Sequence, residues 1–159
     1  MEKINDFTNI EILGINSAIS SVRDQKMQNG SSVPGCAFPA KESFAIGKIE
    51  GQISSTIKNY EARVQELRKK LGWEDADHVV TAKEVKIFNK ETKELGEEVQ
   101  SDLSLQPMAL KAFLDMEKDE YFRRGKPVPQ EFFSGMGRLI VDDTEEEKTE
   151  EAPMKKEKK

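Results

Sequence analysis

Cysteine and histidine are almost absent from this sequence, which contains one of each among its 159 residues. One cysteine cannot form a disulfide framework, and the pair cannot supply the nitrogen and sulfur ligands of a usual zinc site. A cysteine nucleophile would need His78 as the base for Cys36, and neither residue lies in a recognisable catalytic context. We therefore expect a solvated loop histidine, a buried or half-buried thiol, and no catalytic residue, metal ligand or cofactor.

Long apolar runs are missing as well. No segment of the sequence approaches the roughly 20 apolar residues that a helix needs to cross a bilayer. Residues Met1 to Asp6 contain no apolar stretch of the kind that signal peptides carry. The sequence therefore predicts no membrane partner and a location on the cytoplasmic side of the membrane.

No single sign of charge dominates, because 25 Lys and Arg residues face 30 Asp and Glu residues, for a net charge of −5. This mild and mixed balance argues against a dedicated nucleic-acid binder. Charged residues make up 35% and hydrophobic residues 36% of the chain, against about 25% and about 45–50% in an average globular protein. We therefore expect a small core and long, solvated helices.

The last eighteen residues, 142–159, have a composition of their own, with eight acidic residues and five lysines. Only Ala152 and Met154 are apolar there, so burial cannot offset the entropy of ordering this segment. We expect a disordered, acidic C-terminal tail that keeps the protein soluble. The alternative is a charged segment that docks on a basic partner.

A first helix is predicted from about residue 9 to residue 28. Thr8 and Glu11 have the spacing of a capping box, and Phe7 and Ile12 that of a hydrophobic staple. Apolar residues then recur on one face, at Ile12, Ile15, Ile19 and Val22. Asn29 and Gly30 are typical of a helix stop.

The strongest pattern predicts a long amphipathic helix over about residues 39–71. Its apolar stripe consists of Ile46, Ile49, Ile53, Ile57, Tyr60, Val64, Leu67 and Leu71. The mean spacing of 3.57 residues is close to the roughly 3.5 of a coiled coil. Because such a helix cannot bury the stripe against itself, the stripe is either core under another helix of this chain or an interface with another subunit.

Two glycines, Gly47 and Gly51, interrupt this helix four residues apart. Each costs roughly 1 kcal/mol of helix stability relative to alanine. The pair indicates either a close crossing with another helix or simple tolerance of the two residues.

Shorter elements are predicted after Gly72. Thr81 has the capping pattern of a helix that ends at Gly96, and Pro107 and Pro129 open two further apolar segments. Val79 and Val80 resemble a short extended stretch, and alternating residues over 99–105 have the pattern of a half-buried strand.

One basic cluster, Arg123, Arg124 and Lys126, follows two aromatic residues. It is too small for a nucleic-acid footprint. It indicates either a helix C-terminus that complements the helix dipole or a contact with phosphate or an acidic partner.

Three segments together resemble a family of small tailed-bacteriophage proteins of unknown function. They are Phe38-Pro39-Ala40-Lys41-Glu42-Ser43-Phe44-Ala45-Ile46-Gly47-Lys48, then Phe88-Asn89-Lys90-Glu91 with Glu94-Leu95, and then Glu97-Glu98-Val99-Gln100-Ser101-Asp102-Leu103. The resemblance covers residues 38–114, whereas 115–141 and the tail depart from the family's pattern. It implies a phage origin and a role in the virion or its assembly, and it carries no catalytic residues.

We therefore predict a mainly α protein with one helical domain, 1–141, in which the long helix packs on a second helix beside a small β element. The expected function is that of a non-enzymatic phage structural or assembly protein that binds copies of itself or a virion component, located in the virion or the host cytoplasm. The alternative is a soluble phage inhibitor or adaptor that binds a host protein.

Overall fold

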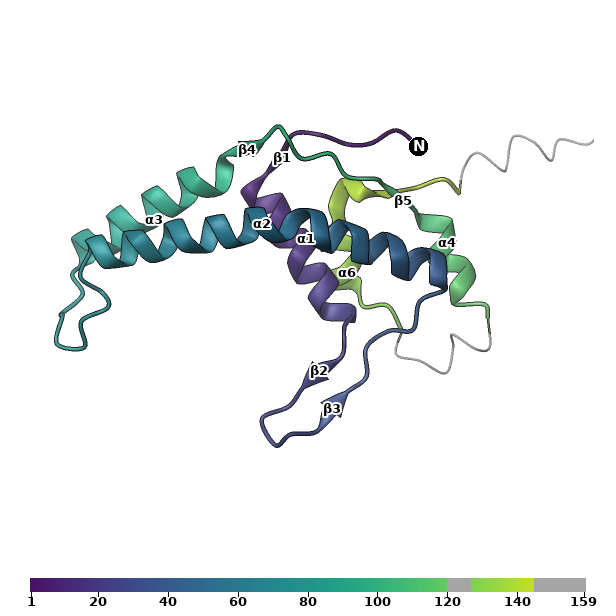
Figure 1. Ribbon diagram of the computed structural model, residues 1–159, viewed down its shortest axis with the longest axis horizontal. Coiled ribbons are helices and arrows are strands. Elements are labelled where there is room, and N and C mark those ends of the chain that lie inside the picture. Colours follow the sequence, from purple (N-terminus) through teal and green to yellow (C-terminus); the bar gives the residue numbers. More distant parts are fainter. Residues whose placement is uncertain (120–126, 145–159) are drawn as a thin grey trace, which may run out of the picture.

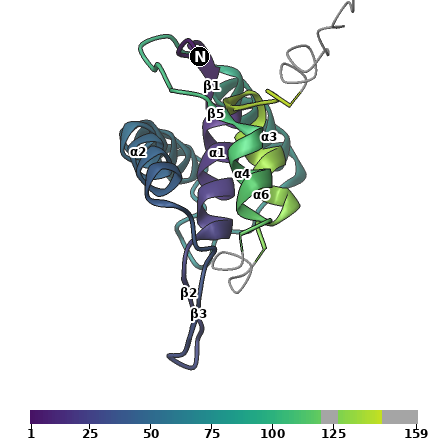
Figure 2. The ribbon, with the colours of Figure 1, turned by 90° about the vertical axis from the view of Figure 1, so that its right-hand side faces the viewer.

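The computed structural model describes residues 1–119 and 127–144, and its helices form a three-layered body from which a pair of helices projects (Figure 1). Helix α1 (Asn9–Val22) is the middle layer of the body. In the end-on view of Figure 2, α2 (Ala40–Lys70) covers one side of α1, and α4 (Leu110–Met116) and α6 (Gln130–Met136) lie on the other. The mainly α fold and the packing of the long helix on a second helix are as predicted.

Helix α1 begins as predicted but ends earlier. Thr8 caps it, and both hydrogen bonds of the capping box with Glu11 are present. The helix ends at Val22 instead of residue 28, because the chain folds back there and Cys36 N donates to Val22 O over 2.9 Å. Its apolar stripe also ends at Val22, so the residues beyond have no core to cover.

A small hairpin replaces the expected last turns of α1. Strands β2 (Gln25–Lys26) and β3 (Ser32–Val33) pair antiparallel and project from the body (Figure 1). Gly30 provides the turn with a φ of +83°, a conformation that costs glycine little. At the base of the hairpin, Gly35 N donates to Asp24 Oδ1 over 2.7 Å.

Helix α2 matches the predicted bounds to within one residue at each end. The first four residues of its stripe, Ile46, Ile49, Ile53 and Ile57, are buried in the main core. Leu67 is also buried, whereas Tyr60, Val64 and Leu71 are half-buried. The stripe therefore has two partners: α1 along its first half and α3 (Ala82–Glu97) along its second.

The closest helix crossing lies between α1 and α6, not on α2. A methyl group on Gly135 would lie 2.7 Å from Gly14 O and 2.8 Å from Ala18 Cβ. Of the two interpretations of Gly47 and Gly51, simple tolerance fits the part of the chain that the structure describes and a close crossing does not, because no atom lies within 4 Å of a methyl group placed on either. Both glycines are on the open side of α2, away from the stripe.

Three short strand pairs and one bridge tie the segments around the body. Strand β1 (Phe7–Thr8) pairs with β4 (Val99–Gln100), and β5 (Met108–Ala109) pairs in parallel with β6 (Ile140–Val141), which follows the short 3-10 helix η1 (Gly137–Leu139). The predicted strand over 99–105 is confirmed at β4 and at Leu105, which bridges to Ile4. Val79 and Val80 are not in a strand; they belong to a loop.

The apolar segments predicted after Pro107 and Pro129 form the helices α4 and α6. The predicted tail lies outside the described residues except for 142–144. There Asp143 Oδ1 accepts a hydrogen bond of 3.0 Å from Lys111 N at the start of α4. The body therefore extends three residues beyond the predicted boundary at 141.

Candidate interaction surface

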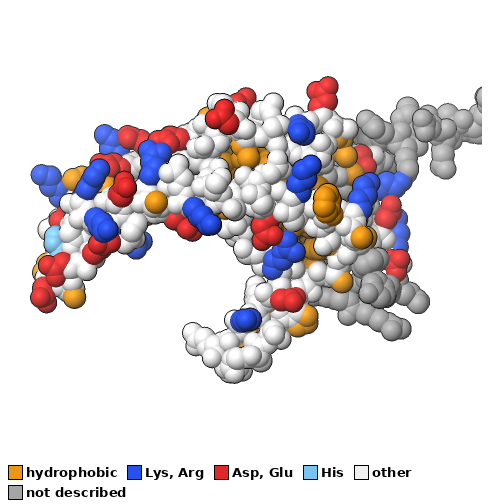
Figure 3. Space-filling model, in the orientation of Figure 1, with side chains coloured by type: hydrophobic (Ala, Val, Ile, Leu, Met, Phe, Trp, Pro, Cys, Tyr) orange, Lys and Arg blue, Asp and Glu red, His pale blue; other side chains and the backbone are white. Residues whose placement is uncertain are grey.

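The most distinctive surface belongs to the projecting pair of helices, residues 58–98, which we call the arm. It consists of the second part of α2, the loop 71–81 and α3, which runs back toward the body (Figure 1). Lys, Arg, Asp and Glu side chains cover its sides, and hydrophobic side chains appear toward its free end (Figure 3). We call the end with the loop the tip and the end at the body the base.

Aromatic stacking holds the two helices together near the tip. The rings of Trp73 and Phe88 lie 4.8 Å apart between centroids, and the Arg68 guanidinium sits 5.8 Å from the centre of the Phe88 ring. The end of α2 and the loop after it therefore pack on Phe88 of α3.

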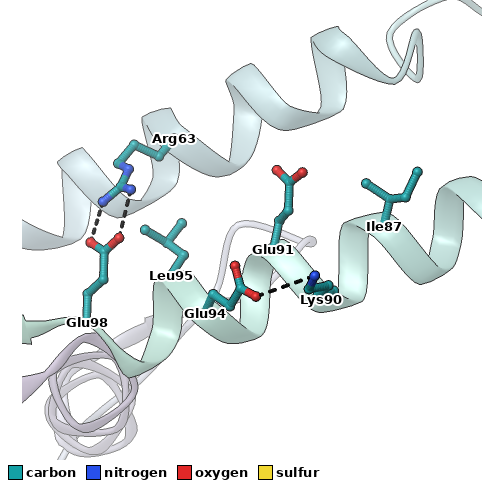
Figure 4. Close-up of a pocket in the computed structure, with 7 residues that line it drawn as sticks. All are labelled: Arg63, Ile87, Lys90, Glu91, Glu94, Leu95 and Glu98. Carbon is teal, nitrogen blue, oxygen red and sulfur yellow. Dashed lines mark hydrogen bonds and ion pairs between the residues drawn. The ribbon is translucent and has the colours of Figure 1, made fainter.

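An ion pair and a buried amide fix the base of the arm. Arg63 of α2 donates to both carboxylate oxygens of Glu98, over 2.5 and 2.9 Å (Figure 4). These hydrogen bonds hold the pKa of Glu98 below its usual value. The buried Asn9 donates to Leu95 O over 2.7 Å and accepts from Gln100 Nε2 over 3.0 Å.

A carboxylate organises the tip. Glu84 accepts a hydrogen bond of 2.9 Å from Thr81 N and completes the predicted capping box. His78 Nε2 lies 3.1 Å from both Glu84 oxygens. The hydrogen bond from the Thr81 backbone, followed by the contact with His78, lowers the pKa of Glu84 to about 2. His78 is a loop residue, as predicted, but its side chain is only partly solvated: it is 28% exposed and lies between Gly72 and this carboxylate.

The tip also exposes aliphatic side chains. Val79 is 81% exposed and Val80 is 50% exposed, and Val85 and Ile87 on α3 are exposed as well. Burying such side chains against a partner is favourable, by roughly 25 cal/mol per Å². The arm is therefore charged along its sides and apolar at its end.

A groove of about 410 Å³ runs along one side of the arm between α2 and α3. The residues that line it are Arg63, Ile87, Lys90, Glu91, Glu94, Leu95 and Glu98. In Figure 4, Ile87, Glu91 and Leu95 point from α3 toward α2. We call the exposed side of α3 that borders the groove, with Ile87, Lys90, Glu91 and Glu94, the groove face. Lys83 lies on the same side, four residues before Ile87. The groove has an aliphatic floor and a charged rim, which suits a protein surface better than a small molecule.

No family model, curated protein or solved structure matches this chain. What the arm can do is therefore argued from its own residues.

Neither a metal site nor a membrane span is found within the described ranges. Among residues 1–119 and 127–144, no group of three or more His, Cys, Asp or Glu side chains could hold a metal ion. In the same part of the chain, no helix is both long and apolar enough to cross a membrane.

The predicted site residues fall into three groups. The stripe of α2 is core in its first half and the inner seam of the arm in its second. Gly47 and Gly51 lie on the open side of α2. Arg123, Arg124 and Lys126 lie outside the described residues, so both interpretations of that cluster stay predictions.

A second exposed surface was not singled out from the sequence. Phe44 is 76% exposed at the start of α2, beside a shallow hollow that Arg23, Gly47 and Lys48 help to line. The position of Phe44 in the long helix indicates this exposure. Phe44 precedes Ile46 by two residues, which is about 200° around the helix. A large aromatic residue there faces away from the stripe.

Proposed function

We propose that this protein is a non-enzymatic structural or assembly protein of a tailed bacteriophage. It acts through helix-mediated contacts with copies of itself or with another virion component, in the virion or in the host cytoplasm. The observation that carries the proposal is the arm, because a helix pair of this kind contributes little to the core of its own chain. Its exposed apolar tip and charged sides supply an interaction surface.

The rigidity of the arm supports this function. The Trp73–Phe88 stack and the Arg63–Glu98 ion pair join its helices at two levels. A preformed surface loses less conformational entropy when it binds than a flexible one. The phage assignment rests on the resemblance of residues 38–114, and the arm, residues 58–98, lies within that range.

The first experiment asks whether the protein accompanies phage particles. Mass spectrometry of purified particles and of assembly intermediates should find the chain in a fixed ratio to a known structural protein. Absence from both would overturn the proposal.

The second experiment asks whether the arm makes the contact. Full-length protein carrying Val79→Asp with Val80→Asp should lose binding to purified particle proteins, since charge replaces the exposed apolar tip. Met27→Asp with Val33→Asp is the control, because it also adds two charges at exposed apolar side chains, 50% and 39% exposed, on the β2–β3 hairpin. Equal binding by both variants would contradict a role for the tip.

A soluble phage inhibitor or adaptor is the second candidate, and the surface around Phe44 favours it. An exposed aromatic residue beside two cationic side chains suits one acidic or amphipathic protein segment. This function predicts that the chain is absent from particles and that a single host protein co-purifies in equal amount, with binding lost in Phe44→Ser. Stoichiometric presence in particles would exclude it.

A further inference from the structure

The groove face of α3 carries its charges in two blocks. Lys83 and Lys90 lie in the half toward the tip, and Glu91 and Glu94 lie in the half toward the base. Ile87, 36% exposed, is placed between the two lysines, four residues after the first and three before the second, so that all three share one side of the helix.

These charges are weakly engaged in the described residues. Neither Lys83 nor Glu91 makes an ion pair there, and Lys90 and Glu94 approach only to 4.0 Å with side chains 77% and 64% exposed. Glu98, by contrast, is already held by Arg63. The four outer charges of the groove face are thus available to a partner.

We propose that the groove face of α3 docks on the same face of a second copy of this chain, with the two helices antiparallel. The proposal rests on the function proposed above and names one of its partners. The charge pattern requires this orientation, because a parallel pair would oppose lysine to lysine and glutamate to glutamate. An antiparallel pair opposes the basic block of each copy to the acidic block of the other.

A two-fold axis between Lys90 and Glu91 satisfies the whole face. It places Lys90 of one copy opposite Glu91 of the other, twice, as an isologous interface must. It also places Ile87 of one copy opposite Glu94 of the other. The carboxylate of that Glu94 then lies between Lys83 and Lys90 of the first copy.

The ends of the arm fit the same alignment. Val80 at the tip is 50% exposed, and Val99 just beyond the base is 51% exposed. Antiparallel pairing brings the tip of one copy toward the base of the other, so that these two exposed valines lie at corresponding ends of the alignment. A different protein would have no reason to match a pattern that is complementary to itself about the middle of one helix.

Charge reversal in full-length protein tests the proposal. One variant carries Lys83→Glu with Lys90→Glu, and the other carries Glu91→Lys with Glu94→Lys. Lys83→Glu and Glu94→Lys place the new charges near the ends of α3, where the helix dipole favours them. Positions 90 and 91 lie in the middle of the helix, so circular dichroism checks that α3 is retained. Lys41→Glu with Lys48→Glu on α2 is the control, since it changes the net charge as much as the first variant at exposed positions away from the groove.

Sedimentation velocity over a concentration series reports the outcome. The wild type and the control should form a reversible dimer. Each groove variant alone should show at least about a tenfold weaker dimer, because like charges then face each other at both copies of every contact. An equimolar mixture of the two groove variants should recover the dimer, since their blocks are complementary.

Three results would overturn the inference: a monomeric wild type throughout the series, a dimer that persists in both variants, or a mixture that stays monomeric. None of them decides the proposed function, which is judged by the presence of the chain in particles. A monomeric protein found in particles would retain the function and would assign the arm to a different virion component. Absence from particles together with the recovered dimer would retain the antiparallel contact alone.

Discussion

Ile53 shows at the scale of one residue what the α2 stripe does, because it lies in the main core with none of its surface exposed. Ile53→Ala should lower the free energy of unfolding by about 2–5 kcal/mol, through lost burial and the cavity left behind. Ser54→Ala, at the exposed neighbouring position, should change it by less than about 0.5 kcal/mol. Urea melts measure both. Equal, small effects would mean that this part of the stripe is not packed in the isolated protein.

Glycines in two environments give a second prediction at the same scale. Gly135→Ala should destabilise the protein by about 1–3 kcal/mol, because the added methyl group would press on the backbone oxygen of Gly14 and on Ala18. Gly47→Ala should stabilise it by about 0.5–1 kcal/mol, since the site is open and alanine favours the helix. Thermal melts compare the two. A stabilising Gly135→Ala would contradict the tight α1–α6 crossing.

Single residues also show where sequence reasoning reaches its limit. The capping boxes at Thr8 and Thr81 were predictable because capping needs only neighbours in sequence. The contact of Gly135 with Gly14 joins residues 121 positions apart, and neither glycine lies in a pattern that names the other. The half-buried position of His78 was not predictable in the same way, because its contact with Glu84 joins a loop to a helix and follows no periodic spacing.

The start of α3 makes the stability of that element depend on pH. The pKa of Glu84 is lowered from 4.5 to about 2, first by the Thr81 backbone hydrogen bond. A lowered pKa in the folded state means that the ionised carboxylate stabilises the protein above about 4.5, and that this contribution is lost as the pH falls toward about 2.

Glu84→Gln tests this dependence, because glutamine keeps the shape but not the charge. The difference in unfolding free energy between wild type and variant should be constant above pH 5 or so, and should shrink as the pH falls below about 4.5. Urea melts followed by Trp73 fluorescence, at a series of pH values, give this difference. A difference that does not change with pH would contradict the role of the charge.

Of the helices, α2 was predicted best, and the helices that pack on its stripe were predicted least well. Periodicity over Ile46 to Leu71 fixes which face must be covered, and both helix ends were expected to within one residue. Periodicity does not identify the elements that cover this face. In the structure, α1 covers the first half of the stripe and α3 the second. The hairpin 25–33 was missed because the spacing of apolar residues in α1 carries no information on the residues after its last contact, at Val22.

Asn9 joins the arm to the body, so its effect belongs to the whole molecule. Asn9→Ala removes the hydrogen bonds to Leu95 O and from Gln100 Nε2. Within the described residues, Leu95 O then keeps only the 3.4 Å hydrogen bond from Glu98 N, and we expect a loss of about 1–3 kcal/mol. Amide hydrogen exchange should then accelerate in α3 more than in α6. Equal acceleration in both helices would show that Asn9 supports the body as a whole and not the junction.

Helix α2 is one unbroken rod of 31 residues, about 46 Å long at 1.5 Å per residue. Four isoleucines clamp one end of it in the core, and the other end is the backbone of the arm. The rod therefore works as a lever with its fulcrum inside the protein. A sideways force on the tip is transmitted as torque to the layer between α1 and α2. A partner that binds Val79 and Val80 therefore also strains the packing around Ile53.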